Sequence, residues 1–364
     1  MSSDRNYALA ENGYNMFSQP GSDSVACVDP AADVLTSLPV LVLNIHNRCN
    51  CRCVMCDIWK RQETSEISVA HLQSHRSAIR ALGVRWVVLS GGEPLMHSDL
   101  ESLCAWLKAE QVRLTLLTSG LLLSRRAETI TRFVDDVIVS IDGPPEVHDR
   151  VRRVRGAFEL IRKGVEALRR YRSNIRVTAR TTVQKANFRV LRSTVDAAKD
   201  LRLDAISFLA ADLTSEAFNR PLLWPVQKQD EIALASEEVE HLQHEIEKLI
   251  VEYPSDIAAG YIVENAPKLR RIVQHFRAQL GLEGAIAPLC NAPWTSAVIE
   301  ADGSVRPCFF HRPIGNIYQL TLDEILNGEQ GRAFRHNLVV ADDPTCRRCV
   351  CSLNYRSPAE HETQ

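Results

Sequence analysis

Short apolar, β-branched runs alternate with amphipathic helical patterns between about residues 40 and 210. Such runs predict strands, and the segments between them, where apolar residues recur at helical spacing, predict helices. The predicted strands are 40–45, 86–90, 113–118, 136–141, 175–183 and 204–209. The predicted helices lie near 67–82, 98–110, 125–132, 156–171 and 188–202. This alternation indicates parallel βαβ units.

Six strand and helix units can form an open doubly wound sheet or curve into a partial barrel, and periodicity alone does not decide between them. Both architectures place the active site at the carboxyl ends of the strands. Within the second predicted helix, Leu100, Leu103, Cys104 and Leu107 form one apolar face. We therefore expect Cys104 to be a core residue.

The rest of the chain divides by composition. Residues 1–38 show no sustained period and predict an irregular arm, whereas 39–212 hold the βαβ units. Residues 213–285 are helical and partly acidic, and their position predicts that they line a pocket between domains. Residues 286–364 predict a small α+β domain, with short strands around the turn Asp302-Gly303 and five of the eleven cysteines.

Composition narrows the class of protein. The chain has 364 residues, of which 45% are hydrophobic and 24% charged, with a net charge of −2, as in a soluble globular protein. It has no apolar run long enough to cross a membrane and no secretory signal, so we expect a cytoplasmic location. Thiols stay reduced there, and clustered cysteines therefore indicate metal binding or catalysis rather than disulfides.

Cys49, Cys53 and Cys56 follow the first predicted strand with the spacing C-x3-C-x2-C. A cubane iron-sulfur cluster normally takes four thiolates, so three would leave one iron without a protein ligand. An open metal position is what a catalytic metal site needs. A zinc site is the alternative for these three cysteines.

Here the sequence resembles the radical S-adenosylmethionine (SAM) superfamily, whose signature is this cysteine spacing after strand one of a partial (β/α)6 barrel. Ser90-Gly91-Gly92-Glu93-Pro94 is similar to the family's Gly-Gly-Glu-Pro motif, and Thr118-Ser119-Gly120 to its Thr-Asn-Gly, with Ser119 replacing asparagine. Ser140-Ile141-Asp142-Gly143, followed by His148-Asp149 and Arg152, is similar to the segment after strand four. The resemblance covers about residues 40–210.

The resemblance implies that Cys49, Cys53 and Cys56 hold a [4Fe-4S] cluster and that SAM chelates its fourth iron. Reduction by a donor such as flavodoxin or ferredoxin then cleaves SAM to a 5′-deoxyadenosyl radical, which abstracts hydrogen from a substrate. The implied SAM-binding residues are Gly91, Gly92, Glu93, Pro94, Ser119, Ser140, Asp142 and Arg180. Structural hydrogen bonding is the alternative for Ser140 and Arg180. Cys51 stands where relatives often have an apolar residue, so we expect it to pack.

A second cysteine set comprises Cys290, Cys308, Cys346 and Cys349. Four thiolates can saturate zinc or a closed iron-sulfur cluster. The spacing resembles the SPASM or shorter "twitch" extension of radical SAM enzymes and implies one auxiliary [4Fe-4S] cluster, with zinc as the alternative. Cys351 lies at a non-matching spacing and is either a spare thiol or a hydrogen-atom donor.

The substrate is less constrained by sequence. Residues 150–180 contain eleven Lys or Arg against two Glu, which predicts either a solvated helix face or a phosphate contact. We expect a small organic substrate, such as a sugar, aminocyclitol or nucleotide-linked metabolite, because the short arm does not suggest a folded peptide-binding domain. A peptide maturase is the runner-up, and a noncatalytic iron-sulfur or zinc protein is the alternative of another class. Nucleic acid and membrane partners are not expected.

Overall fold

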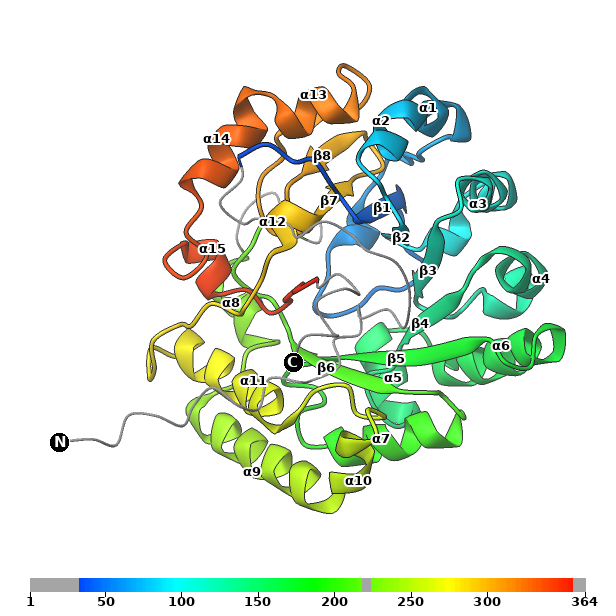
Figure 1. Ribbon diagram of the computed structural model, residues 1–364. Helices are drawn as coiled ribbons and strands as arrows, with labels where there is room; N and C mark the ends of the chain where they lie inside the picture. Colours follow the sequence, from blue (N-terminus) through cyan, green and yellow to red (C-terminus); the bar gives the residue numbers. More distant parts are fainter. Residues whose placement is uncertain (1–32, 218–223, 356–364) are drawn as a thin grey trace.

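The computed structural model describes residues 33–217 and 224–355, which form a curved sheet with helices on its outer side (Figure 1). The arm predicted for residues 1–38 lies outside the described residues except for 33–38. In the described part of the chain, no helix combines the length and the apolar character that a membrane span requires.

Nine strands form the sheet in the order β6-β5-β4-β3-β2-β1-β7-β8-β9. They are β1 Val40–His46, β2 Trp86–Gly91, β3 Arg113–Thr118, β4 Asp136–Ser140, β5 Arg176–Val183, β6 Ile206–Ala210, β7 Ser296–Ile299, β8 Ser304–Arg306 and β9 Gly315–Asn316. Strands β1 to β6 pair in parallel. The six predicted strands are confirmed within two residues at each end, and the sheet is a partial barrel because β6 and β9 are its edges.

The helices cover the convex side. They are α1 Val69–Ser74, α2 Arg76–Ala81, α3 Leu100–Ala109, α4 Leu123–Phe133, α5 Pro145–Arg152, α6 Ala157–Tyr171, α7 Leu191–Asp200, α8 Val226–Asp230, α9 Ser236–Glu252, α10 Pro254–Ala258, α11 Ala266–Gln279, α12 Ala292–Thr295, α13 Leu322–Asn327, α14 Glu329–Asn337 and α15 Pro344–Arg347, with 3-10 turns at Ile58–Lys60 and Pro94–Met96. The helix predicted at 67–82 is interrupted at His75, and α5 was not predicted.

Alternation along the strands separates an apolar outer face from a more polar inner face. On β1, Leu41, Leu43 and Ile45 join the main core beneath the helices. The intervening residues face the inside of the barrel, where Asn44 and His46 are buried near the carboxyl end. Cys104 is buried in the main core, as expected.

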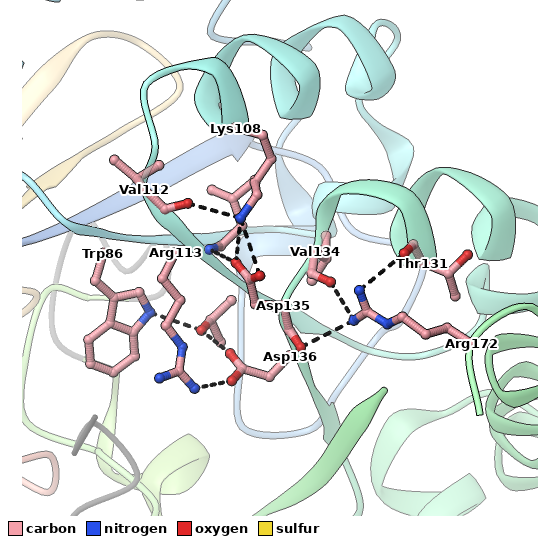
Figure 2. Close-up of polar contacts among 11 residues, drawn as sticks. Trp86, Lys108, Val112, Arg113, Thr131, Val134, Asp135, Asp136 and Arg172 are labelled. Carbon is pink, nitrogen blue, oxygen red and sulfur yellow. Dashed lines mark hydrogen bonds and ion pairs between the residues drawn. The ribbon is translucent and has the colours of Figure 1, made fainter. Parts of the chain in front are cut away.

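Polar contacts close the amino-terminal end of the strands (Figure 2). Trp86 Nε1 donates to Thr115 Oγ1 at 2.9 Å, and Arg113 forms an ion pair with Asp136. Arg172, from the basic segment, donates to the carbonyl of Val134 at 2.7 Å and to that of Thr131 at 3.1 Å. Part of the basic segment therefore stabilises the barrel from the end opposite the cysteine loop.

The carboxyl-terminal unit continues the same sheet. Strand β7 pairs in parallel with β1, and β8 and β9 follow as antiparallel strands, so the predicted small domain shares the barrel's hydrogen bonding. The last described residues turn into the barrel (Figure 1), where Tyr355 packs against Val40, Trp86 and Val88. Asn291 fixes this end through its side chain, which bonds the backbone N and O of Tyr355 at 2.8 and 2.7 Å.

Candidate functional site

The cysteine loop lies at the carboxyl end of β1 and is attached to the end of α5. The backbone N–H groups of Arg52 and Val54 donate to the carbonyls of Arg152 and Val151, both at 3.2 Å. Cys53 is 7% exposed, whereas Cys49 and Cys56 are partly exposed. The loop is therefore held at its centre and leaves two of its three candidate ligand thiols accessible.

The surroundings of these thiols suit an anionic iron-sulfur cluster. Arg152 Nη1 lies 3.5 Å from Cys53 Sγ, and the Ile58 N–H donates to Cys56 Sγ at 3.4 Å. Donors of this kind stabilise thiolate ligands. The residues present therefore fit the cluster that the cysteine spacing predicts.

Cys51 is buried between its neighbours. It is 1% exposed, and hydrogen bonding with the Cys49 thiol together with burial raises the pKa of Cys51 to about 12. This placement agrees with the expectation that Cys51 packs rather than binds metal.

Gly91 and Gly92 bring the end of β2 against the base of the cysteine loop. A Cβ on Gly91 would lie 2.4 Å from the carbonyl oxygen of His46, and one on Gly92 would lie 2.1 Å from that of Arg48. Gly92 N–H donates to His46 O at 2.7 Å, and Glu93 N–H to Arg48 O at 2.8 Å. Glycine is required here by close approach of two backbone segments, besides any contact with SAM.

Gly92→Ala should therefore displace the cysteine loop. Because the obstacle is backbone, we expect a loss of about 1–3 kcal/mol in the free energy of unfolding and a lower iron content after reconstitution. Gly284→Ala is the control, since a Cβ there meets nothing within 4 Å. Denaturant unfolding and iron analysis of both variants check this, and equal behaviour of the two would contradict the structural role of Gly92.

Glu93 is fully buried and accepts four hydrogen bonds. Its Oε1 accepts from Leu95 N at 3.0 Å and Thr118 Oγ1 at 2.7 Å, and its Oε2 from Ser119 N at 2.7 Å and Ser119 Oγ at 2.6 Å. Burial raises the pKa of Glu93, while these bonds act against that rise. Glu93 thus joins the ends of β2 and β3, and Pro94 begins the turn that follows it. Contact of Glu93 with SAM stays a prediction.

Asp142 is the centre of a buried network after β4. It is 0% exposed, its Oδ2 accepts from Arg152 Nε at 2.6 Å, and its Oδ1 accepts from Thr182 N at 3.1 Å. Its backbone N–H donates to His148 Nδ1 at 3.2 Å, and burial lowers the pKa of His148 to about 4. In this structure Asp142 holds Arg152, and a contact with SAM stays a prediction.

Ser140 and Arg180 are register partners on β4 and β5, so the structure brings two of the predicted SAM-binding residues together. Arg180 lines a cavity between the barrel, α11 and the carboxyl-terminal segment. This cavity, which we call the α11 cavity, also has Glu264, Lys268, Arg271 and Cys351 in its wall. Burial raises the pKa of Glu264 to about 7, so the cavity wall is cationic at neutral pH and below.

A second cavity opens between β1, the two glycines and the turn around β8. Asn44 Oδ1 and His46 Nε2 are buried there without a hydrogen-bond partner among the described residues. Their other ends are fixed, since Asn44 Nδ2 donates to Glu300 Oε2 and His46 Nδ1 pairs with Glu66 Oε1, both at 2.9 Å. Unpaired buried polar atoms are costly, so these two indicate a ligand that supplies N–H or O–H groups.

The second cysteine set gathers beside the α11 cavity. Cys349 and Cys351 line the cavity, and Arg271 Nη2 donates to the carbonyl of Cys349 at 3.1 Å. Burial raises the pKa of the Cys308 thiol, and charge on Cys290 and Cys351 adds to this rise. These three thiols therefore lie near one another. The predicted auxiliary ligands therefore meet close to Arg180, together with the unmatched Cys351.

Cys346 has two additional neighbours that sequence reasoning missed. Its Sγ lies 3.5 Å from His311 Nε2, and its N–H donates to Asp343 Oδ1 at 2.8 Å. Ligand atoms of these three residues lie within 4.8 Å of one another, which is compact enough for one metal ion. His311 follows Cys308 by three residues, and that short spacing was the available signal.

Two family models match the chain, one over the range that contains the first cysteine set and one over the range that contains the second. A family model of the radical SAM superfamily matches residues 43–198, and a model of an iron-sulfur cluster-binding domain, SPASM, matches residues 290–350.

Individual proteins are similar to this chain over different parts of its length. The chain is 27% identical over 342 residues to Fe-coproporphyrin III synthase of Methanosarcina barkeri, covering 88% of this chain and 84% of that protein. It is 31% identical over 176 residues to AdoMet-dependent heme synthase of the same organism, covering 46% of this chain and 49% of that protein. Streptococcus suis SuiB bound to S-adenosylmethionine has a similar fold, with a TM-score of 0.60 and 13% identity over 88% of this chain and 74% of SuiB.

Proposed function

Because the chain belongs to the radical SAM superfamily and carries a SPASM-type iron-sulfur domain, we propose that it is an enzyme that abstracts hydrogen from a small anionic organic substrate. Its cofactors are a [4Fe-4S] cluster, SAM and an auxiliary iron-sulfur cluster. In this proposal Cys49, Cys53 and Cys56 hold the first cluster, which when reduced supplies the electron that cleaves SAM to a 5′-deoxyadenosyl radical.

The chain's own residues position SAM and substrate. Ser140 and Arg180, adjacent across β4 and β5, offer a hydroxyl and a guanidinium to the ribose or carboxylate of SAM. Gly91, Gly92, Pro94 and Ser119 shape the loops around it. An external one-electron donor such as flavodoxin or ferredoxin completes the proposed system.

The observation that carries the substrate class is the cationic wall of the α11 cavity. Lys268 and Arg271 line it beside Cys349 and Cys351, and Arg180, which we propose contacts SAM, lies in the same wall. Carboxylate or phosphate groups suit such a wall. A relative of matching length is named for making Fe-coproporphyrin III, an iron tetrapyrrole that bears carboxylates. Our first candidate substrate is therefore an iron tetrapyrrole that carries more carboxylates than this product.

The test uses anaerobically reconstituted, reduced protein with SAM and one candidate substrate at a time. An iron tetrapyrrole with more carboxylates than coproporphyrin, GTP and a peptide mixture represent the carboxylate, nucleotide-linked and peptide classes. We expect a several-fold increase in 5′-deoxyadenosine with an anionic small molecule, together with a changed mass of that molecule. Stimulation by peptides alone would favour the maturase alternative, and a protein with full iron and no SAM cleavage would favour a noncatalytic role.

Glu264 should make anion binding depend on pH. Its raised pKa, about 7, means that it is neutral at pH 6 and ionised at pH 8, where its charge opposes an anion near Arg180. Absorbance titration with iron coproporphyrin III should show several-fold weaker binding at pH 8 than at pH 6 for the wild type and no such change for Glu264→Gln.

The same ionisation of Glu264 lowers the stability of the wild type as pH rises from about 4.5 to 7. If the affinity for iron coproporphyrin III changed with pH in the same way in the wild type and in Glu264→Gln, this role of Glu264 would be contradicted.

A further inference from the structure

Arg152 connects the cysteine loop to the buried centre of the barrel. Its Nη1 lies 3.5 Å from Cys53 Sγ, although the two residues are 99 positions apart in the chain. Its Nε bonds Asp142 Oδ2 at 2.6 Å, and the side chain is almost completely buried. The guanidinium therefore bridges a carboxylate and a candidate cluster ligand in a largely buried position.

The carboxylate that holds Arg152 is itself immobilised. Asp142 Oδ1 accepts from Thr182 N at 3.1 Å, and its carbonyl accepts from Asn187 Nδ2 at 3.0 Å. The same Asn187 group also donates to the carbonyl of Thr182 at 3.0 Å, which joins the loop after β4 to the end of β5. These hydrogen bonds of 3.0–3.1 Å fix the position of the guanidinium from the ends of β4 and β5 rather than from the cysteine loop.

The backbone of α5 holds the loop as well. The carbonyls of Val151 and Arg152 accept from the N–H groups of Val54 and Arg52, on either side of Cys53. One helix end thus supplies two backbone acceptors and one cationic donor to three consecutive loop residues.

We propose that Arg152 is a positioning residue that fixes Cys53 and sets the reduction potential of the SAM-cleaving cluster. The inference rests on the proposed function, because it takes Cys53 as a ligand. Hydrogen bonds to cluster sulfurs and nearby net charge set the potentials of iron-sulfur clusters. A fixed, desolvated positive charge stabilises the reduced cluster, which carries one more negative charge than the oxidised cluster.

The experiment measures the midpoint potential of this cluster by EPR-monitored titration, with iron content and circular dichroism for each protein. Arg152→Gln removes the charge but keeps a polar side chain, and Arg152→Lys keeps the charge. Arg150→Gln is the matched control, because Arg150 lies on the same helix and its guanidinium donates to the carbonyl of Ala186 instead. Cys349→Ala provides a background in which the SAM-cleaving cluster is measured without the auxiliary signal.

We expect a more negative potential in Arg152→Gln, a potential near the wild type in Arg152→Lys, and no shift in Arg150→Gln. Full iron with the wild-type potential in Arg152→Gln, or an equal shift in Arg150→Gln, would overturn the inference. If Arg152→Gln is folded but holds no cluster, restored iron in Arg152→Lys supports the role of the charge, and failure of a folded Arg152→Lys rejects it. Unchanged iron and an unchanged EPR spectrum in Cys53→Ala would instead reject the proposed ligand role of Cys53.

Discussion

Replacing Cys53 with alanine should remove about four irons per chain and abolish the formation of 5′-deoxyadenosine. The loop offers three thiols at a spacing that leaves one iron open, and Cys53 is the buried one of the three. Its loss removes the ligand that the chain fixes through α5, and the two remaining thiols are partly exposed. Two thiolates do not hold a four-iron cluster against loss to solvent.

Cys51→Ala is the matched control for this prediction. Cys51 lies two positions away and is buried, as Cys53 is, but it is not one of the three cysteines of the C-x3-C-x2-C spacing. Iron content, the EPR signal of the reduced cluster and 5′-deoxyadenosine yield should all stay at wild-type levels in this variant. The ligand assignment would be wrong if Cys51→Ala lost the cluster while Cys53→Ala kept it.

Cys349→Ala should remove the auxiliary cluster and leave the first one in place. We expect iron to fall from about eight to about four per chain, with SAM cleavage retained in the absence of substrate and substrate turnover lost. The physical reason is position: Cys349 lies in the wall of the α11 cavity, where Arg271 holds its carbonyl at 3.1 Å. Cys349 would therefore hold the auxiliary cluster at the edge of the cavity proposed for the substrate.

Cys351→Ala separates the assigned ligands from the spare thiol. Cys351 lines the same cavity, and its carbonyl oxygen lies 2.5 Å from Cys349 Sγ. We expect this variant to keep about eight irons. If Cys351→Ala lost about four irons and Cys346→Ala lost none, Cys351 rather than Cys346 would be the fourth ligand of the auxiliary cluster. One zinc with about four irons in the wild type would instead reject the auxiliary iron-sulfur cluster for this protein.

The barrel strands were predicted because each is a short run rich in apolar or β-branched residues between helical patterns. The sequence pattern missed α5 because Pro145–Arg152 is short and strongly charged, so that no apolar stripe identifies it as a helix. It also treated the carboxyl-terminal unit as separate, whereas β7 pairs with β1. Which strands far apart in the chain pair with each other depends on which edge of the sheet is open. The local sequence pattern of a strand does not predict this.

The candidate site, like the fold, was predicted from the sequence only in part. Motif spacing located the cysteines and the loops that follow β2, β3 and β4, because these are local features. The bond between Arg152 and Cys53, and the closure of Glu93 by Thr118 and Ser119, join separate segments and became visible only in the fold. The unpaired atoms of Asn44 and His46 likewise depend on how β1 packs against the turn around β8.

The central claim is that this protein uses its cysteine loop to cleave SAM reductively. The most direct measurement is 5′-deoxyadenosine formation by anaerobic, reduced, fully reconstituted wild-type protein, compared with Cys53→Ala treated in the same way. We predict 5′-deoxyadenosine and methionine in equal amounts from the wild type and neither from the variant. Wild-type protein with a full complement of iron that yields no more 5′-deoxyadenosine than Cys53→Ala would contradict the account.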